Sequence, residues 1–314
     1  MMKERISIVG GGAIGFTLAA SLQSEGRQVV VYRVTAQNSS SKRSRIIVKL
    51  QDGTKLVEEI ATERLAPTTT LNGSVIVTAK AFGNSKIAEM MSSYKEKLDL
   101  VLLQNGIGVE APFLGKNFKS ISRCVVYITA ERLESGEFTA RMVKPSPIGI
   151  LEQNGSTEPG LAKSISTGQF KFYEEKDILK EVWMKGIINT VFNSICPLLD
   201  IDNGIFIRDS GVLALAKDIV HECVPVAETL GISLTADEII EQIKAISLRS
   251  NGQLISTLQD LRARRETEIQ YFNMAICRIA SSVKPPQKLA KTELLGFLIE
   301  KKSKLESEKI NRLD

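Results

Sequence analysis

Two hydrophobic patterns divide the chain. In the first half, Ala13–Glu25 has apolar residues at helical intervals and ends at Gly26, and it lies between two strand-like runs, Ile6–Val9 and Val29–Tyr32. Further buried strands are predicted at Val75–Thr78, Leu100–Leu103, Cys124–Ile128 and Phe170–Tyr173. Strands that alternate with helices are typical of a mostly parallel sheet covered on both faces. The pattern therefore predicts an α/β domain with a doubly wound sheet.

The second half is predicted to be helical. Its long helical windows are Ile178–Leu199, Val212–Leu230, Thr235–Leu248, Leu254–Ala263 and Thr267–Val283. Thr267 and Gln270 have the spacing of a capping box, which would start the last of these helices. The mixed-charge tail 301–314 is predicted to be a solvated helical end or a frayed terminus. We expect two domains, an α/β domain of residues 1–175 and an all-helical domain of residues 176–314.

Composition excludes several classes of function. The 314 residues are 43% hydrophobic and 25% charged, as in ordinary globular proteins, and no apolar run approaches a membrane span. The 4 cysteines lack ligand spacing, which fits a reducing cytoplasm and argues against a metal site. The single histidine, His221, leaves little for a Ser-His-Asp hydrolase, and we expect it to be structural. A dispersed net charge of +5 argues against a nucleic-acid partner. We expect a cytoplasmic protein without metal, membrane or nucleic-acid contacts.

A glycine-rich loop follows the first strand. Its residues fit the pattern G-x-G-x-x-G between a strand and an amphipathic helix: Gly10, Gly11, Gly12, Ala13, Ile14 and Gly15. Gly10 would permit the tight turn, Gly12 would admit a pyrophosphate to the backbone, and Gly15 would let the helix pack close to the sheet. The helix N-terminus offers N–H groups to phosphates. The loop therefore predicts a dinucleotide site in a Rossmann-type domain.

The end of the second strand indicates which dinucleotide is bound. NAD-binding domains usually carry an acidic residue there, whereas this chain has Arg33 and no acid before Asp52. A guanidinium fits a 2′-phosphate, and Lys42 or Arg43 could add charge. We therefore predict NADP (NADPH) rather than NAD, and leave the role of loop 34–44 open.

Polar residues also recur on predicted helices of the second half. Lys185, Asn189 and Asn193 have the spacing i, i+4, i+8 and form one stripe on an otherwise apolar helix. Such a stripe is costly to bury unless polar groups face it, although a partly exposed helix edge would have the same spacing. A straight helix would separate Ser256 from Glu268 by about 18 Å. Both can reach one small ligand only if the chain bends between them.

Together these features resemble the ketopantoate reductases (2-dehydropantoate 2-reductases) over nearly the whole chain. The residues that carry the resemblance are the glycine loop, Arg33, Val77–Ala81, Gln104–Gly108, Trp183 with Lys185, Asn189 and Asn193, Asn203–Gly204, Ser256–Asp260 and Thr267–Ile269. The resemblance implies an N-terminal Rossmann domain, a C-terminal helical domain and a substrate cleft between them. It also implies reduction of 2-dehydropantoate to pantoate with NADPH, in pantothenate and coenzyme A biosynthesis.

The resemblance assigns roles to single residues. It implies that Lys185 is the catalytic lysine and that Glu268 lies near this lysine and the nicotinamide ribose. The residues that it implies for substrate binding are Asn105, Lys185, Asn189, Asn193, Asn203 and Ser256, with Ser256 holding the carboxylate. Lys80 and Asn105 match residues at the cofactor.

Departures from the family pattern leave the substrate open. Gln253 stands where the family usually has asparagine, Asn251 lies two positions further back, and Ile255 also departs from the usual sequence. One alternative is a paralogous NADP-dependent reductase of another 2-oxo acid or an opine-like substrate. Another is a dinucleotide-binding regulatory protein without catalysis. The sequence does not determine the oligomeric state, and a homodimer is one option.

Overall fold

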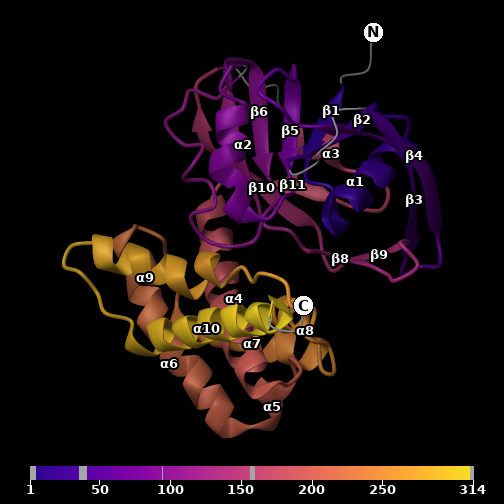
Figure 1. Ribbon diagram of the computed structural model, residues 1–314. Coiled ribbons are helices and arrows are strands. Elements are labelled where there is room, and N and C mark those ends of the chain that lie inside the picture. The colour runs from indigo at the N-terminus through magenta and orange to yellow at the C-terminus, as the bar shows by residue number, and fades with distance from the viewer. Residues whose placement is uncertain (1–4, 35–40, 94, 156–159, 312–314) are drawn as a thin grey trace. The chain divides into compact units, whose positions relative to one another are not determined.

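The computed structural model describes residues 5–34, 41–93, 95–155 and 160–311. The chain divides into two compact units, one formed by Met1–Asn105 and Val109–Ile178 and the other by Gly106–Gly108 and Leu179–Asp314 (Figure 1). This division falls at the start of a long helix, whereas the sequence places a boundary after residue 175. The short segment Gly106–Gly108 leaves the first unit and packs with the second.

The strands described in the first unit form one 11-stranded sheet. In chain order they are β1 (Ile6–Val9), β2 (Val29–Arg33), β3 (Lys42–Leu50), β4 (Lys55–Arg64), β5 (Gly73–Val77), β6 (Leu98–Leu102), β7 (Ser120–Cys124), β8 (Ile128–Arg132), β9 (Phe138–Met142), β10 (Ser146–Gln153) and β11 (Phe172–Glu174). The order across the sheet is β11-β10-β7-β6-β5-β1-β2-β4-β3-β9-β8. The run from β7 to β4 is parallel, and antiparallel pairs join β10 to β7, β3 to β4 and β8 to β9.

Helices cover this sheet, which confirms the predicted α/β class. They are α1 (Ala13–Ser24), η1 (Ala81–Gly83), α2 (Asn84–Met90), η2 (Lys95–Lys97) and α3 (Leu161–Ile165). Successive residues of a buried strand point to opposite faces. Accordingly, Ile8 joins a core with Phe16 and Leu18 of α1. Val9 joins a second core with Ile87 of α2.

The structure differs from the predicted strands at two places. The predicted strand Cys124–Ile128 is wrong, because the chain leaves β7 at Cys124 and enters β8 only at Ile128. Val125 and Val126 are buried without belonging to a strand, so their apolar character does not mark one. Lys42 and Arg43, expected in a loop, lie in β3; residues 35–40 of that loop lie outside the described residues.

The second unit is helical in its described part. Its elements are α4 (Ile178–Leu199), α5 (Ile205–Arg208), α6 (Ser210–Thr229), α7 (Ala236–Arg249), α8 (Ser256–Arg262), η3 (Ile269–Tyr271), α9 (Asn273–Ser282) and α10 (Ala290–Asn311). The bounds of α4 agree with the prediction to the residue. Thr235 and Glu238 form a capping box at the start of α7. Among the described residues, no helix combines the length and the apolar character needed to span a membrane.

The predicted helix from Thr267 to Val283 is wrong at its start. A short 3-10 turn, η3, comes first, and α9 begins only at Asn273. The side-chain oxygen of Gln270 accepts a hydrogen bond from Arg278 at 3.0 Å, so this carboxamide is used in a different contact from the expected capping box. Helix α10, of which only the tail was anticipated, continues to Asn311.

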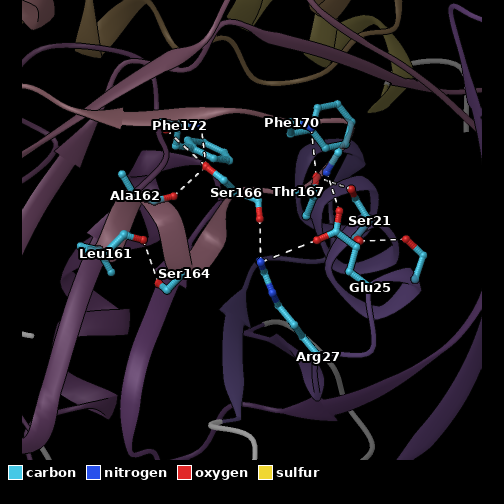
Figure 2. A network of polar contacts seen from close by, with 12 residues as sticks. Ser21, Glu25, Arg27, Leu161, Ala162, Ser164, Ser166, Thr167, Phe170 and Phe172 are labelled. Atoms are coloured by element: carbon cyan, nitrogen blue, oxygen red, sulfur yellow. Dashed lines mark hydrogen bonds and ion pairs between the residues drawn. The ribbon is translucent and has the colours of Figure 1, made fainter. Parts of the chain in front are cut away.

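A polar network ties the end of α1 to the segment that follows α3 (Figure 2). The buried hydroxyls of Ser21 and Thr167 are 2.7 Å apart, and Thr167 Oγ1 also accepts the N–H of Phe170 at 3.0 Å. Arg27 donates to the carbonyl of Ser166 at 2.7 Å, and the Glu25 carboxylate accepts the N–H of Gly168. The network fastens the segment leading into the edge strand β11 onto the helix that begins at the glycine loop.

We expect Thr167→Val to destabilise the protein by about 1–3 kcal/mol, because it leaves a buried hydroxyl and a buried N–H without their partner. Urea unfolding followed by circular dichroism measures this change. The matched control is Thr129→Val on the exposed side of β8, which should shift the unfolding free energy by less than about 0.5 kcal/mol. Equal effects of the two substitutions would contradict the role given to the network.

Candidate functional site

The glycine loop packs backbone against backbone at the end of β1. Gly10 has a φ of +129°, its N–H donates to the carbonyl of Tyr32 at 2.9 Å, and its own carbonyl accepts from Thr78 Oγ1 at 3.0 Å. A Cβ on Gly10 would lie 2.3 Å from the nitrogen of Ala79, and one on Gly15 would lie 1.9 Å from the carbonyl oxygen of Gly10. Neither position can carry a side chain without moving the backbone.

Gly12 differs, because a Cβ built on it meets no atom of the described residues within 4 Å apart from its chain neighbours. Gly12 is the N-cap of α1, and this helix start has no side-chain cap and no acidic residue in its first turn. Ala13 and Ile14, which follow, are half-buried. A phosphate can therefore approach the positive end of α1 at Gly12 without obstruction by the described residues. The loop fits the pyrophosphate of a dinucleotide.

Arg33 ends β2 beside this loop. Its guanidinium lies over the Phe16 ring, 5.4 Å from the ring centre, and its Nε is 3.0 Å from where a Cβ on Gly11 would stand. Arg33 is otherwise exposed. The aromatic ring of α1 thus holds a planar cation at the edge of the glycine loop.

Strand register adds two more cations to this edge. Arg64 of β4 is the register partner of Arg33, and Lys42 of β3 is the partner of Thr62, two residues before Arg64. Register partners and residues two apart on a strand share a face of the sheet. Lys42, Arg64 and Arg33 therefore lie on the same face, whereas Arg43 lies on the other. Arg64 was not identified from the sequence, because β4 was not predicted.

A buried pair of carboxamides positions the loops after β5 and β6. Asn84 Nδ2 donates to Gln104 Oε1 at 2.9 Å, and Gln104 Nε2 donates back to Asn84 Oδ1 at 2.7 Å. Gln104 Nε2 also donates to the carbonyl of Ala79 at 2.6 Å. Lys80 directly follows Ala79, and Asn105 directly follows Gln104, so the pair sets where both exposed side chains begin. The contribution of Asn84 could not be recognised from the motif.

Helix α4 carries the predicted polar stripe. Lys185 and Asn189 are half-buried and Asn193 is buried, on one face at intervals of one helical turn. Asn193 Nδ2 donates to the carbonyl of Asn189 at 3.0 Å, and Asn193 Oδ1 accepts from Ser256 Oγ and from the N–H of Thr257, both at 3.3 Å. The structure therefore brings Asn193 and Ser256 together, and the amide of Asn193 is used to hold the start of α8.

The stripe has a second neighbour at its Lys185 end. A Cβ on Gly186 would lie 2.5 Å from Ile107 Cδ1, so Ile107 packs directly on α4. The N–H of Ile107 donates to the carbonyl of Tyr271 at 2.8 Å, and the N–H of Tyr271 donates to the carbonyl of Glu268 at 2.9 Å. Half-buried Glu268 thus begins the turn η3, to which the Ile107 backbone is bonded.

The chain bends between Ser256 and Glu268, which is the condition under which both could reach one small ligand. Helix α8 ends at Arg262, and Arg264 then adopts a φ of +52°, which a continuing right-handed helix does not allow. The separation of about 18 Å expected for a straight helix therefore does not apply.

Asn203 is buried with an unsatisfied oxygen. Its N–H donates to the carbonyl of Gln253 at 2.9 Å, and its carbonyl accepts from Ser247 Oγ at 2.7 Å. The residue is only 7% exposed, and its Oδ1 has no hydrogen-bond partner among the described residues. A buried unsatisfied oxygen costs about 1–3 kcal/mol, which a ligand donor could offset. The described residues hold no cluster of His, Cys, Asp or Glu suited to a metal ion.

Comparisons with known proteins agree over most of the chain. The sequence model described as ketopantoate reductase PanE/ApbA matches residues 6–153, and the one described as its C terminal matches residues 177–292. The 2-dehydropantoate 2-reductase of Archaeoglobus fulgidus is 22% identical over 88% of this chain and 91% of that protein.

Two solved structures have the same fold. D-mandelate dehydrogenase, solved with NADH and anilino(oxo)acetate, has a TM-score of 0.81 at 20% identity and covers 96% of this chain and 99% of that one. A dimeric ketopantoate reductase from Staphylococcus aureus has a TM-score of 0.77 at 17% identity, over 96% of this chain and 100% of that one. At these identities the likeness establishes the fold.

We expect Gly12→Ala and Gly15→Ala to separate ligand binding from folding. The free energy of unfolding of the Gly12 variant should lie within about 1 kcal/mol of the wild type, because a Cβ there has open space among the described residues. The variant should nevertheless bind dinucleotide at least about 10-fold more weakly. The Gly15 variant should lose about 1–3 kcal/mol of stability through overpacking. Denaturant unfolding and fluorescence titration measure the two effects. Undiminished binding by the Gly12 variant would refute the placement of the phosphates.

Proposed function

Because this chain belongs to the ketopantoate reductase family, we propose that it reduces a 2-oxo acid with NADPH, with 2-dehydropantoate as substrate and pantoate as product. This reaction would serve pantothenate and coenzyme A biosynthesis. The observation that carries the proposal is the α4 stripe, in which Lys185 is followed by two carboxamides on one face of a helix. A regulatory protein that only binds dinucleotide would have no use for that stripe.

The cofactor part of the proposal is supported by charge at the glycine loop. A 2′-phosphate is recognised by guanidinium groups through paired, charge-assisted hydrogen bonds. Arg33 is held over Phe16, and register places Arg64 and Lys42 on the same face of the sheet. No acidic residue ends β2, where a ribose 2′-hydroxyl would otherwise be bound. These residues favour NADPH, although the mandelate dehydrogenase of the same fold was solved with NADH.

Catalysis would rest on a proton held by Lys185. NADPH, when bound, supplies the hydride. Negative charge then develops on the ketone oxygen, which the ammonium of Lys185 would stabilise and protonate from Nζ. Glu268 would orient that ammonium, and solvent would return the proton to the amine.

The carboxamides and Ser256 would hold the substrate. The Oδ1 of Asn203 would accept a hydrogen bond from a substrate hydroxyl, which would supply the partner that the described residues lack. The side-chain amide of Asn189 would donate a hydrogen bond to a carbonyl oxygen of the substrate. Ser256 would donate to the carboxylate, and Asn193 would keep Ser256 in place through the contact already formed.

A second substrate is favoured by one specific observation. Gln253 and Ile255, on the segment that precedes Ser256, depart from the family's usual residues, and the side chain of Gln253 is exposed. The fold-related mandelate dehydrogenase was solved with a different 2-oxo acid derivative, anilino(oxo)acetate. A 2-oxo acid with another side chain is therefore the alternative substrate.

We expect the purified protein to oxidise NADPH fastest with 2-dehydropantoate among a panel that includes pyruvate and 2-oxoisovalerate.

Arg33→Gln should raise the KM for NADPH about 10- to 100-fold and leave the KM for NADH nearly unchanged, because it removes charged hydrogen bonds to the 2′-phosphate. The absorbance of the reduced nicotinamide follows cofactor oxidation in both experiments. A preference for another 2-oxo acid would promote the alternative substrate, and equal use of NADH would refute the cofactor assignment.

We expect Lys185→Ala to lower kcat by about 10²- to 10⁴-fold while NADPH binding stays nearly unchanged, because the general acid is lost and the cofactor residues are not. Lys217→Ala, an exposed lysine on α6, is the matched control and should keep wild-type turnover. Stopped-flow turnover and fluorescence titration with NADPH separate the two effects. Full turnover by Lys185→Ala would eliminate the proposed mechanism.

A further inference from the structure

One carboxylate outside the α4 stripe joins two segments that are distant in sequence. Asp202 accepts from both terminal nitrogens of Arg208, Nη1 to Oδ1 at 3.1 Å and Nη2 to Oδ2 at 2.7 Å. Asp202 Oδ1 also accepts the N–H of Gly204 at 2.7 Å and the N–H of Gly252 at 2.9 Å. Asp202, Gly204 and Arg208 lie between α4 and α6, whereas Gly252 lies in the loop between α7 and α8.

Further contacts reinforce this junction. Arg208 Nη1 also donates to the side-chain oxygen of Asn251, so the guanidinium grips both segments. A Cβ on Gly204 would meet the side-chain ends of Asn251 and Arg208, so a side chain at this position would force both of them to shift. Beside them, the N–H of Asn203 donates to the carbonyl of Gln253 at 2.9 Å.

Neighbouring donors stabilise the charged form of the Asp202 carboxylate. Hydrogen bonds from Arg208 and Gly252 are the main reason that the pKa of Asp202 lies far below its ordinary value. An isolated surface ion pair contributes little to the free energy of folding. Here, however, Arg208 donates to both oxygens of Asp202, and the N–H groups of Gly204 and Gly252 donate to the same carboxylate. The Asp202 side chain is 22% exposed, so the junction lies near the surface of the second unit.

The junction stands next to two residues given roles in the proposed reaction. Asn203, with its unsatisfied Oδ1, directly follows Asp202. The segment from Gly252 leads to Ser256 at the start of α8, where Asn193 holds Ser256 Oγ and the N–H of Thr257. We call residues 252–256 the recognition segment. Asp202 holds one end of this segment and Asn193 holds the other.

We propose that Asp202 and Arg208 form a latch that positions Asn203 and Ser256 and thereby sets selectivity among 2-oxo acids. This inference rests on the proposed function and deepens it. The latch residues do not touch the reacting atoms; they act through the backbone of the segments that they join. The amide of Asn251 belongs to this latch, whereas the side chain of Gln253 is exposed.

We expect Asp202→Asn to raise the KM for the preferred 2-oxo acid about 10-fold and to reduce its preference over pyruvate, because the charged contacts to Arg208 are lost. At saturating substrate, kcat should change less than 3-fold, and the Kd for NADPH should be unchanged, because both loops lie in the second unit. Hydrogen exchange of the peptides covering 200–208 and 250–256 should become faster.

Matched variants show whether the effect belongs to the latch. Asp218→Asn removes another exposed ion pair, that with Lys291, and should leave KM and selectivity unchanged. Arg208→Gln should change KM and selectivity as Asp202→Asn does. The double variant should show no larger change than the more strongly affected single variant, because the two residues act as one unit. Arg208→Lys should recover only part of the selectivity, since an ammonium lacks the planar fork.

The outcomes distinguish the latch from the function on which it rests. If the wild type oxidises NADPH with no 2-oxo acid, the proposed function fails and the latch has no substrate to position. If the wild type is active and folded Asp202→Asn keeps wild-type KM and selectivity, only the latch is overturned. A variant that loses kcat in proportion to its folded fraction, with KM unchanged, likewise overturns the latch, because that is the behaviour of a purely structural contact.

Discussion

The missing side chains at Gly10 and Gly15 are the constraint on which the first unit depends. Gly15 packs against the carbonyl of Gly10, and Gly10 packs against Ala79, so α1 can begin directly above the end of β1. From that start, Phe16 and Leu18 reach the core of the sheet. Phe16 in turn seats Arg33. The backbone contact that permits the fold therefore also shapes the place for the phosphates and for the cation beside them.

In the second unit, buried polar groups have the organising role. Asn193 lies inside an apolar helix and uses its amide to hold Ser256 and Thr257. Ser247 and Gln253 fix the backbone of Asn203, which leaves its side-chain oxygen unsatisfied. Buried polar groups are expensive unless they are paired. Here the paired ones position a loop, and the unpaired one marks where a ligand donor would be favourable.

The sequence predicts elements well where the local pattern is strong. The bounds of α4 agree with the prediction to the residue because its 22 residues form one largely apolar run in which Lys185, Asn189 and Asn193 recur at intervals of four. The strand β3 is not evident from the sequence because its inward residues Ile46, Val48 and Leu50 stand among charged residues. Val125 and Val126 resemble a strand because they are buried in a connection. Motif residues such as Arg33 could be identified singly. Their partners, Arg64 and the Asp202–Arg208 pair, depend on strand register and on loops brought together by folding, which no local pattern encodes.

The central claim is direct hydride transfer to the carbonyl carbon of a 2-oxo acid, and isotope transfer tests it most directly. NADPH deuterated at either face of C4 would be incubated with the protein and 2-dehydropantoate, and the hydroxy acid formed would be analysed by mass spectrometry. Direct hydride transfer should place deuterium at C2 of the product from one C4 face and not from the other. Oxidation of the cofactor with unlabelled product from both faces, or no oxidation at all, would contradict it.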